Sequence, residues 1–295
     1  MTGPTDAAGA SMRGRVVLIS GANTGIGAVT ARELARRGAH VVLACRSESR
    51  TQPVLDQIEA DRRLDQGPGR ADWLALDLAD LDSVRRCAAA FLARDQPLHV
   101  LIHNAGVAGV RGLSASGFEL AFGINHIGPF LLTQLLLPRL RESAPARVVT
   151  VASRAHRLVG GIAWAHLREP TRSWLTAREY GQSKLANVLF SAELGRRLQG
   201  SGVTTQALHP GVIASDLWRH VPAPLAWLLR TRGISTERGA QLTLRCASAE
   251  AAALGSGQYF SHDRVATPSR AARDPLLAAT LWQRSADWVQ ADATA

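Results

Sequence analysis

Short apolar runs alternate with longer amphipathic segments along most of this chain, and no other feature restricts its fold as strongly. Runs of strand length that are apolar or rich in β-branched residues occupy 16–19, 41–44, 73–76, 100–102, 148–151, 204–208 and 258–260. Segments with apolar residues at helical spacing lie at 26–37, 54–64, 84–93, 118–141 and 177–198. Strands that alternate with helices pair in parallel through right-handed crossovers. The pattern therefore predicts an α/β fold with a doubly wound, mostly parallel, seven-stranded sheet and helices on both faces.

The length and composition support one hydrophobic core. The chain has 295 residues, of which 46% are hydrophobic and 20% charged, so it is neither disordered nor fibrous. We expect residues 1–13 to form a flexible N-terminal arm and 14–266 to form a single domain. Residues 267–295 are expected to form a C-terminal tail.

Composition argues against several other classes of protein. No uninterrupted apolar run approaches the roughly 18 residues that span a bilayer, and residues 1–14 contain no apolar leader, so we expect a cytoplasmic protein without stable membrane insertion. The cysteines, Cys45, Cys87 and Cys246, are too widely spaced for a disulfide framework or a metal-binding pair, and we expect no metal. The net charge of +10 comes from dispersed arginines, which do not form the basic stripe that nucleic-acid binding requires.

A glycine-rich loop follows the first predicted strand and leads directly into a helix. Gly21, Gly25 and Gly27 let the backbone turn tightly and approach a pyrophosphate, while the helix N-terminus offers free N–H groups to the anion. This arrangement predicts a Rossmann-type nucleotide site. The alternative is a tight turn that only packs.

Several motifs recur in order along the chain. They are the G-x3-G-x-G loop, Asp77-Leu78 after the third strand, His103-Asn104-Ala105-Gly106 after the fourth, Asn125, Ser153, the Tyr180-x3-Lys184 pair, and His209-Pro210-Gly211 after the sixth strand. In these motifs the chain resembles the short-chain dehydrogenases/reductases. The sequence around Asn23 and Arg46, and the 27 positions from Ser153 to Tyr180, are similar to the retinol-dehydrogenase-like branch. His103 and Pro129 depart from the family pattern.

The resemblance implies a dinucleotide site built from residues distributed over most of the chain. Its expected members are Gly21, Asn23, Thr24, Gly25, Ile26, Gly27, Arg46, Asp77, Leu78, Asn104, Ala105, Gly106, Tyr180, Lys184, Pro210, Gly211, Ile213 and Ser215.

Tyr180 and Lys184 have the chemistry that carbonyl reduction needs. Hydride transfer to carbon leaves negative charge on oxygen, which requires a proton donor. Tyr180 can donate this proton, and Lys184, one helical turn on and the only lysine in the chain, favours its phenolate. Ser153 can hydrogen-bond the substrate oxygen, and the family counterpart of Asn125 holds a water that connects the lysine to solvent. The alternative is an ordinary exposed pair of side chains.

The end of the second strand indicates which nucleotide is bound. An NAD site of this type carries an acidic residue about 20 positions after the glycines, to bind the ribose 2′-hydroxyl. Arg46 lies there instead, and its guanidinium matches a 2′-phosphate. We therefore expect NADP(H), unless Arg46 is simply a solvated surface residue.

Residues 212–232 contain several apolar side chains in a polar frame, among them Leu217 and Trp218. They predict a lid over an apolar substrate, with a membrane-facing or oligomer-facing helix as the alternative. The branch suggests retinoids, steroids or long aldehydes, and the arginine-rich composition, typical of GC-rich bacteria, makes the polyketide ketones of secondary metabolism equally plausible.

We thus expect an NADPH-dependent oxidoreductase that interconverts a carbonyl and an alcohol on a small hydrophobic substrate. The alternative is a catalytically idle, NADP-sensing or scaffold protein on the same fold. The long helices predicted at 118–141 and 177–198 could pair across a two-fold axis in a homodimer or homotetramer.

Overall fold

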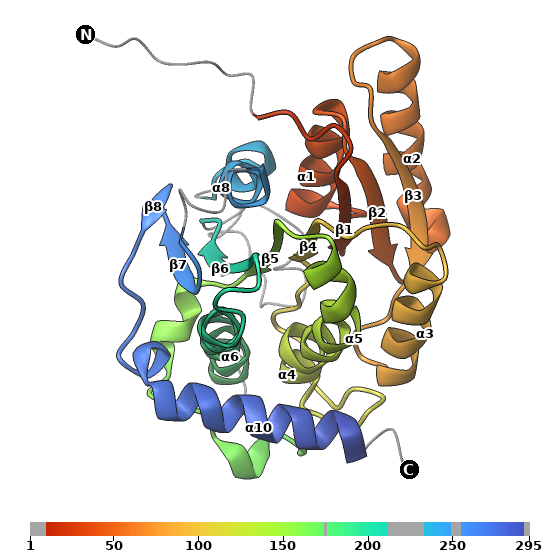
Figure 1. Cartoon of the computed structure of the whole chain (residues 1–295). Coiled ribbons are helices and arrows are strands. Elements are labelled where there is room, and N and C mark those ends of the chain that lie inside the picture. The colour runs from red at the N-terminus through yellow and green to blue at the C-terminus, as the bar shows by residue number, and fades with distance from the viewer. Residues whose placement is uncertain (1–9, 174–175, 212–232, 249–254, 292–295) are drawn as a thin grey trace, which may run out of the picture.

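An eight-stranded sheet forms the centre of the computed structural model, which describes residues 10–173, 176–211, 233–248 and 255–291 (Figure 1). The strands are β1 (Val16–Ser20), β2 (His40–Cys45), β3 (Arg70–Ala75), β4 (Val100–His103), β5 (Ala146–Val151), β6 (Val203–His209), β7 (Gln258–Ser261) and β8 (Arg264–Val265). Their spatial order is β3-β2-β1-β4-β5-β6-β7-β8, and only the β7–β8 pair is antiparallel. The predicted parallel, doubly wound sheet is confirmed. The additional β8 has two residues, too few for an apolar period to predict it.

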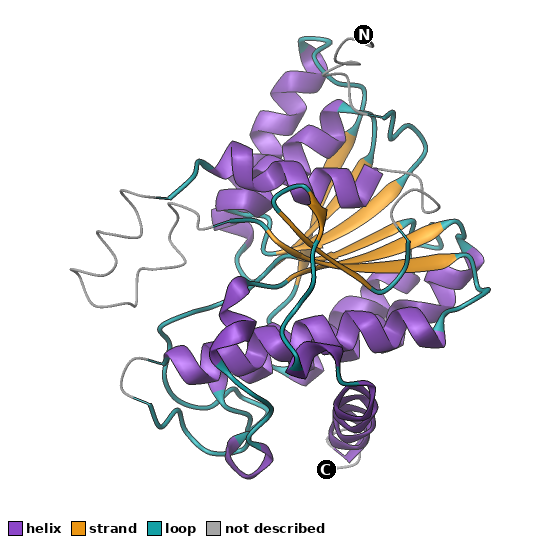
Figure 2. Cartoon of the chain, turned by 90° about the vertical axis from the view of Figure 1, so that its left-hand side faces the viewer, coloured by secondary structure: helices purple, strands orange, loops and turns teal. Residues whose placement is uncertain are grey.

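Helices cover both faces of this sheet (Figure 2). One face is covered by α1 (Gly25–Arg36), α2 (Glu48–Arg63) and α8 (Thr236–Ser248). The other carries α3 (Leu81–Leu92), α4 (Leu120–Phe122), the π-helical turn η1 (Gly123–Ile127), α5 (Gly128–Glu142), α6 (Ala177–Arg197) and α10 (Pro275–Ala291). Short 3-10 turns are η2 (Arg154–Leu158), η3 (Trp164–His166) and η5 (Ala271–Arg273).

The strands divide the interior into two apolar layers. Along β1, Val17 and Ile19 pack toward α1 and α8, whereas Val16 and Leu18 pack toward the opposite layer. Successive side chains of a strand point to opposite faces, so a strand buried on both sides reads as a continuous apolar run. This burial explains why the alternation of apolar runs and helices could be recognised in the sequence.

The strand order reverses between β1 and β4, which lie side by side at the centre of the sheet. In open α/β sheets such a switch point leaves a crevice at the carboxyl ends of the strands. The loops after β1, β2, β4, β5 and β6 therefore meet at the same edge.

Helix α2 begins six residues earlier than the sequence indicates, at Glu48 instead of residue 54. Ser47 caps it, since its hydroxyl accepts a hydrogen bond from the backbone N–H of Arg50 at 3.2 Å. Pro53 lies inside this helix, and prolines usually interrupt a helix. The spacing of apolar residues therefore predicted that the helix begins after Pro53.

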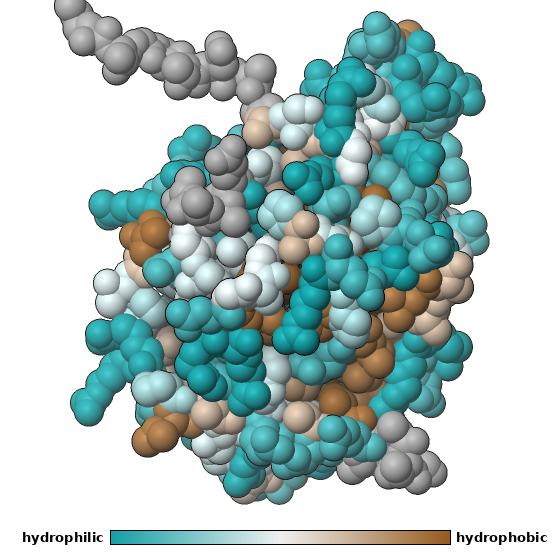
Figure 3. Space-filling view, in the orientation of Figure 1, coloured by the Kyte–Doolittle hydropathy of each residue, from teal (hydrophilic) through white to brown (hydrophobic). Residues whose placement is uncertain are grey.

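The predicted helix at 118–141 is present as a nearly continuous run, Leu120–Glu142, through α4, η1 and α5. An 18-residue window of this run has a mean hydropathy of 1.4, which would suit a membrane span, but 72% of that window is buried in the domain. Packing against α3 and α6 therefore accounts for its apolar character. In space-filling view, α2 is covered by hydrophilic residues, and apolar side chains gather over α4 and α5 just above α10 (Figure 3).

The expected C-terminal tail contains a docked helix, which the sequence analysis did not predict. Helix α10 crosses α6 at the base of the molecule (Figure 1), and Trp282 stacks on Phe190 of α6 with ring centroids 6.0 Å apart. Ser285 also meets the buried His126 at 3.0 Å. This part of the tail belongs to the domain, because α10 packs on α6.

The N-terminal boundary is also shifted. Met12 is buried, and its backbone N–H donates to the carbonyl of Arg37 at 2.8 Å. The predicted arm at 1–13 therefore extends too far into the chain, because Met12 is anchored on the domain.

Candidate active site

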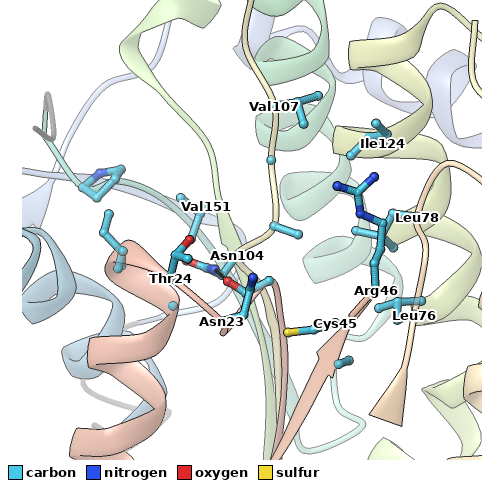
Figure 4. Close-up of a pocket in the computed structure, with 18 of the residues that line it drawn as sticks. Asn23, Thr24, Cys45, Arg46, Leu76, Leu78, Asn104, Val107, Ile124 and Val151 are labelled. Carbon is cyan, nitrogen blue, oxygen red and sulfur yellow. Dashed lines mark hydrogen bonds between the residues drawn. The ribbon is translucent and has the colours of Figure 1, made fainter. Parts of the chain in front are cut away.

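A cavity of about 780 Å³ opens at the carboxyl edge of the sheet, at the switch point (Figure 4). It brings together residues from the loops after β1, β2, β3, β4, β5 and β6 and from the start of α6. Most of the predicted site lines it: Gly21, Asn23, Thr24, Gly25, Ile26, Gly27, Arg46, Asp77, Leu78, Asn104, Ala105, Gly106, Ser153, Tyr180, Lys184, Pro210 and Gly211. One cavity thus combines the nucleotide motif with the candidate catalytic pair.

The glycine loop is fixed by close contacts that only glycine permits. Gly21 has a φ of +66°, and a Cβ there would lie 2.8 Å from Ala105. A Cβ at Gly27 would lie 2.4 Å from the Asn104 side-chain nitrogen. That Asn104 amide in turn donates to the carbonyls of Ser20 and Gly21, each at 3.0 Å. The loop is therefore clamped between β1 and the chain after β4.

The N-terminus of α1 opens into this cavity. Thr24 is its N-cap residue, yet its side chain makes no capping hydrogen bond. The first backbone N–H groups of a helix lack partners within the helix and carry a partial positive charge. They are therefore available to an anion such as a pyrophosphate.

Two arginines line the cavity beside the end of β2. Arg46 is exposed and extends past Leu78 toward Ile124, across the opening from Asn23 and Thr24 (Figure 4). Arg50, in the first turn of α2, is the second, and the sequence analysis did not include it. Arg50 lies four residues after Arg46 and follows the helix-capping Ser47, and this spacing could have indicated that both arginines face the same site.

Cys45, which directly precedes Arg46 at the end of β2, connects two parts of the site. The Cys45 thiol accepts a hydrogen bond from the backbone N–H of Ala22 at 3.2 Å, which ties the end of β2 to the glycine loop. Burial raises the pKa of this thiol above its usual value, so it stays neutral. Arg46 and Arg50 therefore give this corner positive charge, and the side chain at position 45 is uncharged.

Tyr180 and Ser153 both line the cavity and lie close enough for their side chains to form a hydrogen bond. Ser153 lies two residues after β5 and caps η2, since its hydroxyl accepts a hydrogen bond from the backbone N–H of Ala155 at 3.2 Å. Burial raises the pKa of Tyr180 to about 12, and a hydrogen bond with Ser153 offsets part of that rise. The phenol is protonated in this state, as a proton donor must be.

Lys184 lies one turn along α6 and is almost fully enclosed, with 3% of its surface exposed. Its ammonium donates to the carbonyl of Val151 at 3.0 Å and sits 5.7 Å from the centre of the Tyr180 ring. Burial lowers the pKa of Lys184 to about 8. The predicted pair is thus buried and adjacent, not an exposed surface pair.

Asn125 lies in η1 and holds the loop after β4. Its side-chain oxygen accepts from the backbone N–H of Val107 at 2.8 Å, and its amide donates to the Val107 carbonyl at 3.0 Å and the Ser183 hydroxyl at 2.9 Å. The side chain therefore positions the cavity wall beside Tyr180 and Lys184. The water-holding function implied by the resemblance stays a prediction.

Both departures from the family pattern are accommodated locally. His103 is buried, and its Nε2 meets the Thr133 hydroxyl on α5 at 2.7 Å. Burial lowers the pKa of His103 to about 3, so it is neutral. Pro129 lies in the first turn of α5, directly after η1. A proline there cannot donate to the carbonyl of Asn125, four residues earlier, which fits a break from α-helical to π-helical geometry at that point.

Asp77 has a local structural role in addition to lining the cavity. Its carboxylate accepts from the backbone N–H of Ala79 at 2.9 Å, and its own N–H donates to the Ser83 hydroxyl at 2.9 Å. These bonds shape the turn after β3 that presents Leu78 to the cavity.

Some predicted residues cannot be placed, and some lining residues were not predicted. Ile213, Ser215, Leu217, Trp218 and the lid expected at 212–232 lie outside the described residues. Cavity residues missing from the sequence analysis include Ser47, Arg50, Val107, Ile124, His209 and Thr236. His209 was noted only as part of a motif, although its place at a strand end could have indicated it.

Comparison with known proteins agrees with this geometry. A family model described as short chain dehydrogenase matches residues 15–225. Retinol dehydrogenase 12 from Mus musculus is 48% identical over 277 residues, which cover 93% of this chain and 86% of that protein.

Solved structures are similar over most of their length. An uncharacterised protein from Mycobacterium paratuberculosis matches with a TM-score of 0.79 and 38% identity over 98% of both chains. The Pseudomonas aeruginosa RhlG/NADP active-site complex matches with a TM-score of 0.68 and 28% identity, over 86% of this chain and 96% of that one.

Proposed function

Because the chain belongs to the short-chain dehydrogenase/reductase family, in its retinol-dehydrogenase-like branch, we propose that it is an NADP(H)-dependent oxidoreductase that interconverts carbonyls and alcohols on hydrophobic substrates. One observation carries the proposal: Tyr180, Lys184 and Ser153 line the same cavity as the glycine loop and Arg46. The cavity would hold the dinucleotide with its pyrophosphate at the N-terminus of α1.

In the reducing direction, a bound NADPH would supply the hydride for the carbonyl carbon, and the residues of the site would have to handle the negative charge that this leaves on the carbonyl oxygen. Tyr180 donates its phenolic proton to that oxygen, while Ser153 donates a hydrogen bond to it. The resulting phenolate is stabilised by the Lys184 ammonium. Alcohol oxidation uses the same groups in reverse, with the phenolate accepting the proton.

The choice of NADP(H) over NAD(H) rests on the corner after β2. Arg46 and Arg50 present two cations there, and the side chain at position 45 is a neutral thiol. Guanidinium groups bind phosphate with paired, charge-assisted hydrogen bonds. The name of one structural neighbour, an RhlG/NADP complex, agrees with this choice.

We expect Arg46→Asp to reverse the nucleotide preference. The parent protein should bind NADPH at least about tenfold more tightly than NADH, since one charged hydrogen bond contributes about 1.5–3 kcal/mol. A carboxylate at position 46 would repel the 2′-phosphate and accept from a 2′-hydroxyl. Titration by tryptophan fluorescence measures both affinities.

Arg63→Asp, at the C-terminal end of α2 and outside the cavity lining, changes the net charge equally and serves as the control. Its preference for NADPH should match that of the parent. Equal affinities of the parent for NADPH and NADH would refute the assignment of Arg46.

The proposed substrates are hydrophobic carbonyls. Val107 and Ile124 give the cavity apolar surface, and a relative is named retinol dehydrogenase. We expect retinal, a steroid ketone or a polycyclic ketone to be reduced with a KM at least about tenfold below that of acetaldehyde, because buried apolar surface contributes about 25 cal/mol per Å². Loss of NADPH absorbance measures each rate, and equal KM values would contradict this substrate class.

A further inference from the structure

His209 ends β6 and lines the cavity beside Pro210 and Gly211. It is 4% exposed, and neither of its ring nitrogens has a hydrogen-bond partner among the described residues. Buried polar atoms without a partner are uncommon, because they lose hydration without compensation. The contacts among the described residues therefore do not explain why the ring nitrogens of His209 are buried.

The other fully buried histidines near the site each have a hydrogen-bond partner for at least one ring nitrogen. His103 meets Thr133 at 2.7 Å and His126 meets Ser285 at 3.0 Å. His156 uses both nitrogens, with the Ser153 carbonyl at 2.6 Å and the Ser269 backbone N–H at 3.1 Å. None of these three lines the cavity. The histidine that does line it is the one with two unused nitrogens.

The position of His209 places it at the reacting end of the site. Leu208 packs toward the α1 and α8 layer, so the alternation along β6 directs His209 to the α6 side of the sheet. Lys184 lies on that side and is near enough to act on the charge of His209. Arg46 and Arg50 line the cavity at the end of β2, four strands away in the sheet.

The surroundings keep the imidazole neutral. Burial, together with the charges of Arg154, His262, His156 and Lys184, lowers the pKa of His209 to about 4. A neutral imidazole offers one donor and one acceptor. It therefore suits a ligand group that can both accept and donate hydrogen bonds.

We propose that His209 hydrogen-bonds the nicotinamide half of the bound dinucleotide, through its carboxamide or its ribose hydroxyls, and so positions the nicotinamide ring for hydride transfer. The inference rests on the proposed function. The pyrophosphate and the 2′-phosphate are held elsewhere, by the α1 N-terminus and by Arg46, so His209 acts on the other half of the molecule. It is a positioning residue, distinct from the proton donor Tyr180.

The test compares binding of NADPH with binding of adenosine 2′,5′-bisphosphate, which lacks the nicotinamide half. In His209→Leu we expect the Kd of NADPH to rise about tenfold and that of the fragment to change less than twofold. His209→Gln retains a donor and an acceptor and should recover most of the NADPH affinity. His262→Asn is the control, since His262 is an exposed neighbour outside the cavity wall whose φ of 53° asparagine tolerates. Its affinities should equal those of the parent.

A second arm tests whether His209 accepts a hydrogen bond from the carboxamide amino group. The 3-acetylpyridine analogue of NADPH has an acetyl group in place of the carboxamide, so it lacks that amino group but keeps a carbonyl oxygen and the ribose. If His209 accepts from the amino group, His209→Leu should weaken this analogue less than NADPH; if it binds the carbonyl oxygen or the ribose, both should weaken alike.

Equal weakening of NADPH and the adenosine fragment in His209→Leu would give His209 a purely structural role and overturn the inference. Unchanged NADPH affinity would overturn it as well. A parent protein that binds neither ligand would instead refute the proposed function, so the two failures are distinguishable.

Discussion

Tyr180→Phe is expected to lower kcat for ketone reduction by at least about a thousandfold and to change the Kd of NADPH less than about twofold. The phenolic hydroxyl acts on charge that develops on the substrate oxygen only in the transition state. General acids contribute roughly 10²–10⁴-fold, and the alternative donor, Ser153, is a much weaker acid than a phenol beside an ammonium. The aromatic ring that shapes the cavity remains in this variant.

The chain provides a matched control, because it has two tyrosines. Tyr259 is buried and its hydroxyl has no hydrogen-bond partner among the described residues, but it does not line the cavity. Tyr259→Phe should retain the parent kcat. Steady-state assays at saturating NADPH measure the kcat of both variants. A Tyr180→Phe enzyme that retains most of the parent kcat would support the alternative of a catalytically idle, nucleotide-sensing protein.

Lys184→Arg is expected to reduce both turnover and nucleotide affinity, each by at least about tenfold. The space around the ammonium is small, since a Cβ at Gly106 would lie 3.3 Å from Nζ and the Val151 carbonyl lies 3.0 Å from it. A planar guanidinium cannot replace a compact ammonium that serves the tyrosine and the nucleotide together. A positive charge at position 184 is therefore not sufficient for turnover or for nucleotide binding.

Lys184→Met separates shape from charge, because it retains the length of the side chain and removes the cation. It should fold with a Tm at or above that of the parent, since a buried charge is removed, and yet have almost no turnover. Thermal unfolding and NADPH titration of both variants provide the measurements. A Lys184→Arg enzyme with parental kcat and Kd would show that Lys184 is not part of the site.

The sequence was most informative where local chemistry is strict. The glycine loop, Tyr180 and Lys184 were recognised because each position admits few residue types, and the strands because burial on both faces makes them continuously apolar. Helix α10 could not be predicted in the same way, since its place depends on contacts such as that of Trp282 with Phe190, far away in the chain.

The parts of the site that were missed depend on three-dimensional context. Arg50 reaches the cavity because Ser47 starts α2 ahead of Pro53. His209 is informative only once the absence of partners for its nitrogens among the described residues is known. A histidine in a sequence does not reveal whether its hydrogen bonds are satisfied.

Transfer of deuterium from the nicotinamide to the substrate tests the central proposal most directly. The parent protein is incubated with a hydrophobic ketone and NADPH that carries deuterium at both positions of nicotinamide C4, and the product is examined by mass spectrometry. The account predicts an alcohol with one deuterium on the former carbonyl carbon, formed at the rate at which NADPH is consumed, and almost none with Tyr180→Phe. NADPH binding without any labelled alcohol across retinoid, steroid and polycyclic ketones, or equal labelling by Tyr180→Phe, would contradict it.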